Sequence, residues 1–107
     1  MNYQKMIIAI LQGEDYPDVV KDLNKHGFYV TLLNSTGGFL KKHSVTLMIG
    51  VEEEKLETAT EIIKKHCSAR MENTIIPSEM GTFVTPVQIR KGGAVVFVLD
   101  INQTMKF

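Results

Sequence analysis

The order of hydrophobic and polar positions along the chain predicts a strand, a helix, two strands, a second helix and two more strands. Residues 6–11 are apolar at every position, which is typical of a central strand buried on both faces. Apolar residues alternate with other residues across 28–33 and again across 45–51. This period of two predicts two further strands, joined by a long loop.

Two segments carry the period and the end signals of helices. Pro17 suits the first turn of the first helix, Asp15 is expected to cap its start, and Gly27 is expected to end it. The second helix begins with glutamates at 52–54 and ends with lysines and a histidine at 64–66, as the helix dipole favours. Its apolar stripe repeats at helical spacing and consists of Leu56, Ala59, Ile63 and Cys67.

The stretch after the second helix has no such period. Residues 68–85 are punctuated by proline and glycine and predict a loop, with a short strand at 74–76 as the alternative. Val87 and Ile89 lead through Lys91-Gly92-Gly93 into an apolar run at 94–101, which predicts a β-hairpin over 87–101. The βαββαβ order favours a ferredoxin-like α/β sandwich, with both helices on one face of an antiparallel sheet. The other face is expected to be covered by further copies in a homo-oligomer, because the first strand is apolar on both sides.

The composition narrows the class of protein. A chain of 107 residues with 44% hydrophobic and 22% charged residues is typical of a single domain, here 1–107. The net charge is zero, so no basic field favours polymeric nucleic acid or an anionic membrane as a partner. The apolar run at 6–11 is too short to span a bilayer, and the single cysteine, Cys67, favours the reducing cytoplasm.

The loop after the second strand contains groups that can hold a nucleotide. A Ser-Thr-Gly-Gly turn at 35–38 offers hydroxyls and backbone N–H groups. Gly37 and Gly38 allow positive φ and a close approach of the main chain to a phosphate, and a base could lie against Phe39 and Leu40. The alternative is an ordinary glycine turn without a ligand.

Candidates for catalysis and metal binding are few. His26, His43 and His66 lie at two helix ends and in a loop, at spacings that place no two of them on one metal. Cys67 belongs to an apolar stripe and is expected in the core rather than as a nucleophile. Arg70 either pairs with a phosphate or closes the helix end. We therefore predict no catalytic residue, no metal site and no cofactor.

Several short runs occur together in a fairly specific combination. They are Lys5-Met6-Ile7-Ile8-Ala9-Ile10, Gly27-Phe28 followed by Thr31, Thr36-Gly37-Gly38-Phe39-Leu40, Ile49-Gly50-Val51, Cys67 with Arg70, and Gly92-Gly93-Ala94-Val95-Val96-Phe97-Val98. With these runs, the chain resembles the PII-like cyclic-di-AMP receptors (PstA/DarA-like proteins) over nearly its whole length. The resemblance implies a homotrimer without catalytic activity that binds a cyclic dinucleotide in the clefts between its subunits. It also implies signalling to an effector protein, which the sequence does not identify.

The resemblance further implies a ligand site. Thr31 would hydrogen-bond an adenine edge or backbone, Gly50 would meet the dinucleotide with main-chain groups, and Phe97 would stack on or beside a base. From the residues alone, Phe97 also fits a core position and Gly50 a bulge. The implied ligand-binding residues are Thr31, Gly37, Gly38, Phe39, Leu40, Ser44, Gly50 and Phe97.

Two positions depart from the family's pattern. Tyr29 stands where family members have an arginine, and Ser44 stands where they have an asparagine, whose amide a hydroxyl cannot reproduce. Three functions therefore stay open: a cyclic-di-AMP sensor, a PII-like regulatory protein that has lost this ligand or senses another nucleotide, and a ferredoxin-fold enzyme acting on an acyl phosphate. The enzyme ranks last, because it needs a phosphate cradle and a fixed arginine, whereas the glycine segment leads into Phe39 and Leu40.

Overall fold

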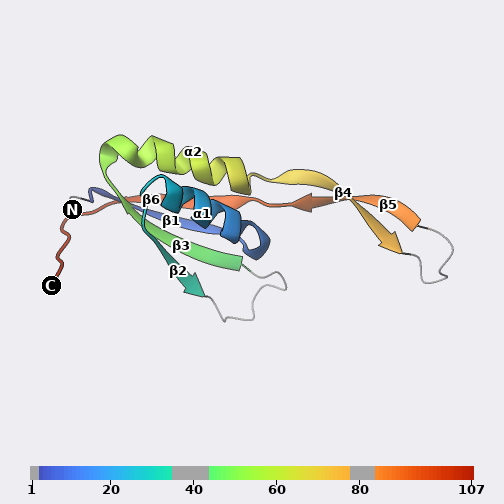
Figure 1. The fold of residues 1–107 in the computed structure, drawn as a ribbon, viewed down its shortest axis with the longest axis horizontal. Coiled ribbons are helices and arrows are strands. Elements are labelled where there is room, and N and C mark those ends of the chain that lie inside the picture. Colours follow the sequence, from blue (N-terminus) through green and yellow to red (C-terminus); the bar gives the residue numbers. More distant parts are fainter. Residues whose placement is uncertain (1–2, 35–43, 78–83) are drawn as a thin grey trace.

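The computed structural model describes residues 3–34, 44–77 and 84–107 (Figure 1). Short 3-10 turns at Gly13–Asp15 and Glu53–Lys55 lead into the two helices. The helices are α1 (Tyr16–Lys25) and α2 (Leu56–Cys67). The strands are β1 (Lys5–Gln12), β2 (Val30–Asn34), β3 (Ser44–Val51), β4 (Arg70–Pro77), β5 (Val84–Lys91) and β6 (Ala94–Asp100).

The main sheet has four strands in the order β2-β3-β1-β6, and every neighbouring pair is antiparallel. Both helices lie on one face of this sheet (Figure 1). This arrangement confirms the predicted ferredoxin-like sandwich. The predicted long loop between β2 and β3 lies outside the described residues. Within the part of the chain that the structure describes, no helix is long and apolar enough to cross a membrane.

The core lies between the sheet and the helices. Ile7, Ala9 and Leu11 of β1 are buried, as is every second residue of β3. They pack against the apolar stripes of α1 and α2, because a strand turns alternate side chains to the same face. The opposite face of β1 has no such cover, and Ile10 is 39% exposed. The predicted burial of this strand on both faces therefore does not occur within a single copy.

The sequence signals at the two ends of α1 have different outcomes. Gly27 has a φ of 86° and its N–H donates to the carbonyl of Asn24, which ends the helix as predicted. Asp15 occupies the N-cap position, but its side chain bonds to no backbone N–H there. It pairs instead with Arg70 at 2.9 Å. The predicted side-chain cap is wrong, because a charged donor from a distant strand makes the stronger bond to this carboxylate.

The strands β4 and β5 form a separate two-stranded antiparallel sheet that projects from the domain (Figure 1). We call this ribbon the arm. The longest dimension of the molecule, including the arm, is 61 Å. The loop predicted over 68–85 is wrong for Arg70–Pro77 and for residues 84 and 85, which begin β5, although the alternative strand at 74–76 lies inside β4. A ribbon that projects from the core does not need the alternation of apolar residues that marks a core strand.

The β-hairpin predicted over 87–101 is also wrong. The strand β5 pairs with β4, whereas β6 pairs with β1, so the chain passes from the arm into the main sheet between them. At this crossing Gly92 and Gly93 have φ values of 78° and 103°, a left-handed conformation that favours glycine. The two glycines therefore serve a change of sheet rather than a hairpin turn.

Candidate functional site

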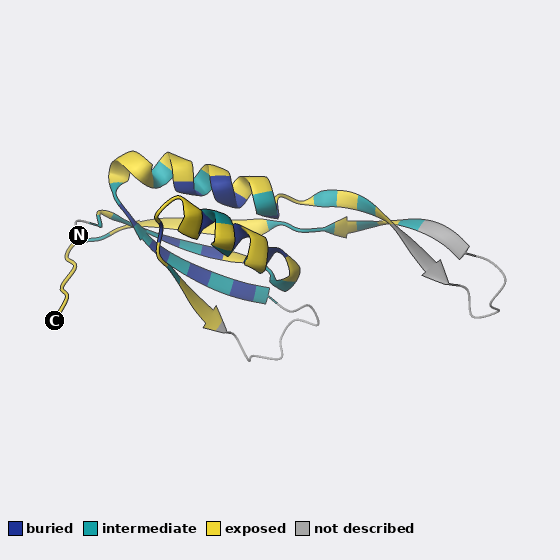
Figure 2. Cartoon of the chain, viewed as in Figure 1, coloured by how far each residue is buried: buried dark blue, intermediate teal, exposed yellow. Residues whose placement is uncertain are grey.

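The face of the main sheet opposite the helices carries exposed apolar side chains. On β6, Val95, Phe97 and Leu99 are 55%, 52% and 45% exposed, and Figure 2 shows the whole strand as exposed. The register places Phe97 opposite Ile8 of β1. Grouped apolar surface of this kind is typical of an interface or a binding site. We call this surface the open face, and its apolar centre consists of Met6, Ile8, Ile10, Val95, Phe97 and Leu99.

The open face also carries four of the sequence-predicted ligand residues, namely Thr31, Ser44, Gly50 and Phe97. Thr31 is the register partner of Met48 of β3, and Met48 is also the register partner of Ile8 of β1. Because Ile8 is in turn the register partner of Phe97 of β6, these residues form one row across the sheet. Strand spacing places Thr31 and Phe97 roughly 14 Å apart, on the two edge strands. The other predicted ligand residues lie outside the described residues: Gly37, Gly38, Phe39 and Leu40.

The predicted residues are also spread along the strands. Ser44 and Gly50 lie at opposite ends of β3, which separates them by roughly 20 Å. One copy of the chain thus brings the described residues to one surface but not into one pocket. This surface can offer an aromatic ring at one edge and hydroxyl groups at the other, which suits binding rather than acid–base chemistry. That these residues contact a ligand stays a prediction.

Tyr3 is a residue of the open face that the sequence analysis missed. Its ring lies against Gly50, where an added Cβ would come within 2.9 Å of the ring atom Cδ2. Gly50 pairs with Met6 in regular register, so it is not a bulge. The absence of a side chain at Gly50 leaves space for this ring. No sequence signal connects Tyr3 with Gly50, because the contact depends on how β1 and β3 pair.

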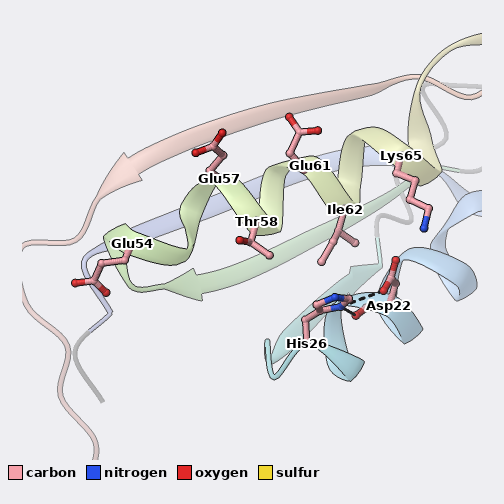
Figure 3. A pocket seen from close by; sticks show the side chains of 8 residues that line it. All are labelled: Asp22, His26, Glu54, Glu57, Thr58, Glu61, Ile62 and Lys65. Atoms are coloured by element: carbon pink, nitrogen blue, oxygen red, sulfur yellow. Dashed lines mark hydrogen bonds and ion pairs between the residues drawn. The ribbon is translucent and has the colours of Figure 1, made fainter.

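A groove of about 570 Å³ lies on the helical side of the molecule, between α1 and α2 (Figure 3). Figure 3 shows acidic side chains along its walls. Its charged residues, apart from a histidine, are Asp22, Glu54, Glu57, Glu61 and Lys65. Walls with this excess of carboxylates disfavour a phosphate. The groove is therefore a poor site for a nucleotide, whereas the open face carries the described ligand residues predicted from the sequence.

Asp22 of α1 connects His26 and His66, which lie at two different helix ends in the sequence. His66 Nε2 lies 2.7 Å from Asp22 Oδ2, and His26 Nδ1 lies 3.1 Å from Asp22 Oδ1. The contact with His66 joins the end of α2 to α1 and is half-buried. Among the residues that the structure describes, no group of three metal-ligating side chains is arranged to hold an ion. The contact between His66 and Asp22 bridges the two helices.

We expect Asp22 to contribute to acid denaturation. The hydrogen bond with His66, together with the charge of His26, holds the pKa of Asp22 below its usual 3.8. A carboxylate with a depressed folded pKa stabilises the folded state above its unfolded pKa, and this contribution is lost as the pH falls through the folded value. Urea unfolding measures the free energy of unfolding from neutral pH to below pH 3.8. As the pH falls through the acidic range, the Asp22→Asn variant should lose less stability than the wild type. Equal losses would contradict this role.

The two remaining chemical candidates are engaged inside the fold. Cys67 is buried in the core, as predicted, and burial raises the pKa of its thiol to about 11, so the thiol is unreactive at neutral pH. Arg70 is held by Asp15 and Glu72, each at 2.9 Å, and hydrogen bonds to these carboxylates raise its pKa. Its guanidinium is occupied by protein carboxylates, so pairing of Arg70 with a phosphate, one of its two predicted roles, does not fit this geometry.

The architecture is that of the PII proteins. It is similar to a solved structure of CPII bound to ADP, AMP and acetate from Thiomonas intermedia K12, with a TM-score of 0.51 and 14% sequence identity. The match covers 94% of this chain and 89% of that chain. Identity this low shows the fold alone, so the comparison establishes a PII-like fold and no shared ligand.

The family is shown by two further comparisons. A crystal structure of a functionally unknown protein from Pediococcus pentosaceus ATCC 25745 matches with a TM-score of 0.81 and 34% identity, over 99% of this chain and 100% of that chain. The family model of the cyclic-di-AMP receptors matches residues 4–107. The chain belongs to the cyclic-di-AMP receptor family, which confirms the resemblance seen in its sequence. Its family and its fold are those of a signalling, nucleotide-binding protein.

Proposed function

We propose that this protein binds cyclic-di-AMP in the clefts between the subunits of a homotrimer and signals to an effector protein in the cytoplasm, without catalysis. The ligand is supported by the family to which the chain belongs. The assembly is supported by the position of Thr31 and Phe97 at opposite edges of the open face. A closed ring joins two different patches of each copy, and the β2 edge and the β6 edge would serve as these two patches. Thr31 of one copy and Phe97 of its neighbour would then line one cleft.

The same assembly would bury the apolar centre of the open face. Val95, Phe97 and Leu99 are each about half exposed in one copy. Removing apolar surface from water contributes about 25 cal/mol per Å², so association of these faces is favoured. The cleft between copies would also exclude water around a stacked base, which strengthens its hydrogen bonds to hydroxyls such as that of Thr31. One surface thus supports both the trimer and the site.

A second candidate is a PII-like regulatory protein that has lost cyclic-di-AMP or senses another nucleotide. Tyr29 is 73% exposed and stands where the family has an arginine. A phenol lacks the charge and the forked donors with which arginine binds a phosphate. The structure of CPII bound to ADP and AMP offers adenine mononucleotides as the ligands to test. The substitution at Ser44 favours the same candidate.

We expect Ser44→Asn to tighten cyclic-di-AMP binding several-fold. The amide would restore one or two hydrogen bonds that a hydroxyl cannot make, each worth on the order of 1 kcal/mol net. Isothermal titration calorimetry measures both proteins, and Thr46→Asn is the matched control. Thr46 is a hydroxyl residue of the same strand and the same face as Ser44 and should respond little.

Two results would overturn the proposal in different ways. Light scattering after size exclusion that shows a monomer at micromolar concentration would remove the cleft between subunits. A trimer whose wild-type and Ser44→Asn forms both give no heat with cyclic-di-AMP would exclude this ligand. Titration of that trimer with ADP and AMP then distinguishes a sensor of another nucleotide from a protein without a small ligand.

A further inference from the structure

The arm meets the rest of the protein at its base. In the part of the chain that the structure describes, β4 and β5 contact each other extensively, whereas their contacts with the other strands and helices are few. The base is formed by the first residue of β4, Arg70, and the last residue of β5, Lys91, which are register partners. The direction of the arm therefore depends on a small set of contacts at this point.

Arg70 connects the base of the arm to the turn between β1 and α1. Its Nη2 donates to Asp15 Oδ1 at 2.9 Å, and its Nε donates to Glu72 Oε1, also at 2.9 Å. Lys91 Nζ lies 3.4 Å from Glu72 Oε2, which ties β5 into the same network. Because a guanidinium is planar and rigid, these bonds specify an orientation as well as a distance.

A second anchor lies beside the first. The side-chain oxygen of Gln12 accepts the N–H of Gly92 at 3.1 Å. Gly92 also packs closely, since an added Cβ would lie 2.6 Å from the carbonyl oxygen of Ser68 and 2.7 Å from Arg70 Nη1. The turn at the end of β5 is thus tied to the end of β1 and packed against the guanidinium of Arg70.

The burial of Asp15 favours the one position of the arm in which Arg70 pairs with this carboxylate. Asp15 is 6% exposed, and its Oδ2 has no hydrogen-bond partner among the described residues. A buried carboxylate is costly unless it is paired, and Arg70 supplies the ion pair. Movement of the arm that withdraws Arg70 would leave this charge unpaired. Buried pairs of this kind contribute little net stability but can select one geometry.

We propose that Gln12, Asp15, Arg70 and Gly92 form a joint that holds the arm in one direction relative to the domain, with Arg70 as its positioning residue. The joint acts through Asp15, which belongs to the domain and does not move with the arm. This role concerns the geometry of the arm and does not depend on which ligand the open face binds.

Electron–electron distance measurements between spin labels test the joint. Labels are attached to Thr58→Cys on α2 and Gln88→Cys on β5, both exposed positions, while the buried Cys67 takes up no label. Labelled protein is diluted with unlabelled protein so that each assembly carries one labelled copy. We expect a narrow distance distribution in the otherwise unchanged protein and a clearly broader or shifted one in Arg70→Gln. Asp15→Asn should have the same effect as Arg70→Gln.

Arg90→Gln is the matched control. Arg90 is an exposed arginine at the base of β5 and forms no ion pair among the described residues, so its variant should keep the narrow distribution. The double variant of Asp15 and Arg70 should be no broader than either single variant, because the pair acts as a unit. If Arg70→Gln does not fold by circular dichroism, Arg70→Lys replaces it, since lysine keeps the charge but lacks the fork. An unchanged distribution in the folded Arg70 variant, or a broad one without any joint substitution, would overturn the proposal.

Discussion

Phe97→Ala is expected to weaken cyclic-di-AMP binding by about 1–3 kcal/mol, or roughly 5- to 150-fold in dissociation constant. The ring lies on the open face and is 52% exposed in one copy, so its removal leaves no cavity in the core. When the assembly is intact, the loss therefore reports on stacking against a base. Calorimetry gives the two dissociation constants, and light scattering on the same samples shows whether the assembly is intact.

Two controls separate stacking from general damage to the open face. Phe97→Leu keeps apolar contact area but removes the aromatic ring, so it should show most of the loss. Val95→Ala shortens an equally exposed side chain on the same face of β6 and should bind almost normally. Wild-type affinity in Phe97→Ala with an intact trimer would remove Phe97 from the site. A comparable loss in Val95→Ala would show instead that the face itself, and not the ring, determines affinity.

Leu47→Ala is expected to lower the free energy of unfolding by about 2–5 kcal/mol. Leu47 is fully buried on the helical face of β3, where its register partners are Ala9 on one side and Leu32 on the other. The truncated side chain would leave a cavity that the packed helices cannot close. Urea unfolding followed by circular dichroism, at a fixed protein concentration, measures this difference.

Leu32→Ala is the matched control for Leu47. It is the same substitution in the neighbouring strand and in the same row, but Leu32 is 39% exposed. Less apolar surface is lost from contact, so the cost should be less than half of that at Leu47. A cost at Leu32 as large as at Leu47 would show that the helical side of β2 is covered in the assembled protein. That result would contradict an interface restricted to the open face and the strand edges.

The core elements could be predicted from the sequence because burial of one side of an element produces a periodic pattern of apolar residues along it. The strand predicted at 45–51 is β3 (Ser44–Val51), and every second residue in it is buried. The stripe predicted in the second helix lies on α2, with Ala59, Ile63 and Cys67 in the core. In each case the alternation or the helical period arises because one side of the element packs and the other faces water.

The arm and the last strand could not be predicted in the same way. The strand β4 belongs to a separate two-stranded sheet, and its residues lack the period by which core strands are recognised, whereas Val87 and Ile89 of β5 alternate with polar residues. The residues after Gly93 were correctly expected to be extended, but their partner is β1, from the other end of the chain, and not β5. The apolar run of β6 indicates that this strand packs in a sheet, but it does not indicate which strand is its partner.

The candidate site divides along the same line. The sequence by itself determined the family, because short runs of residues identify it without knowledge of the fold. It also selected Thr31 and Phe97 as candidate ligand-binding residues. Only the tertiary structure decided that these residues share one uncovered face at opposite edges, that Tyr3 covers Gly50, and that Asp15 pairs with Arg70 rather than capping a helix. Periods, turns and helix ends depend on interactions between neighbours in the sequence. Strand order, register and distant ion pairs depend on which segments meet, and that is decided by the packing of the whole chain.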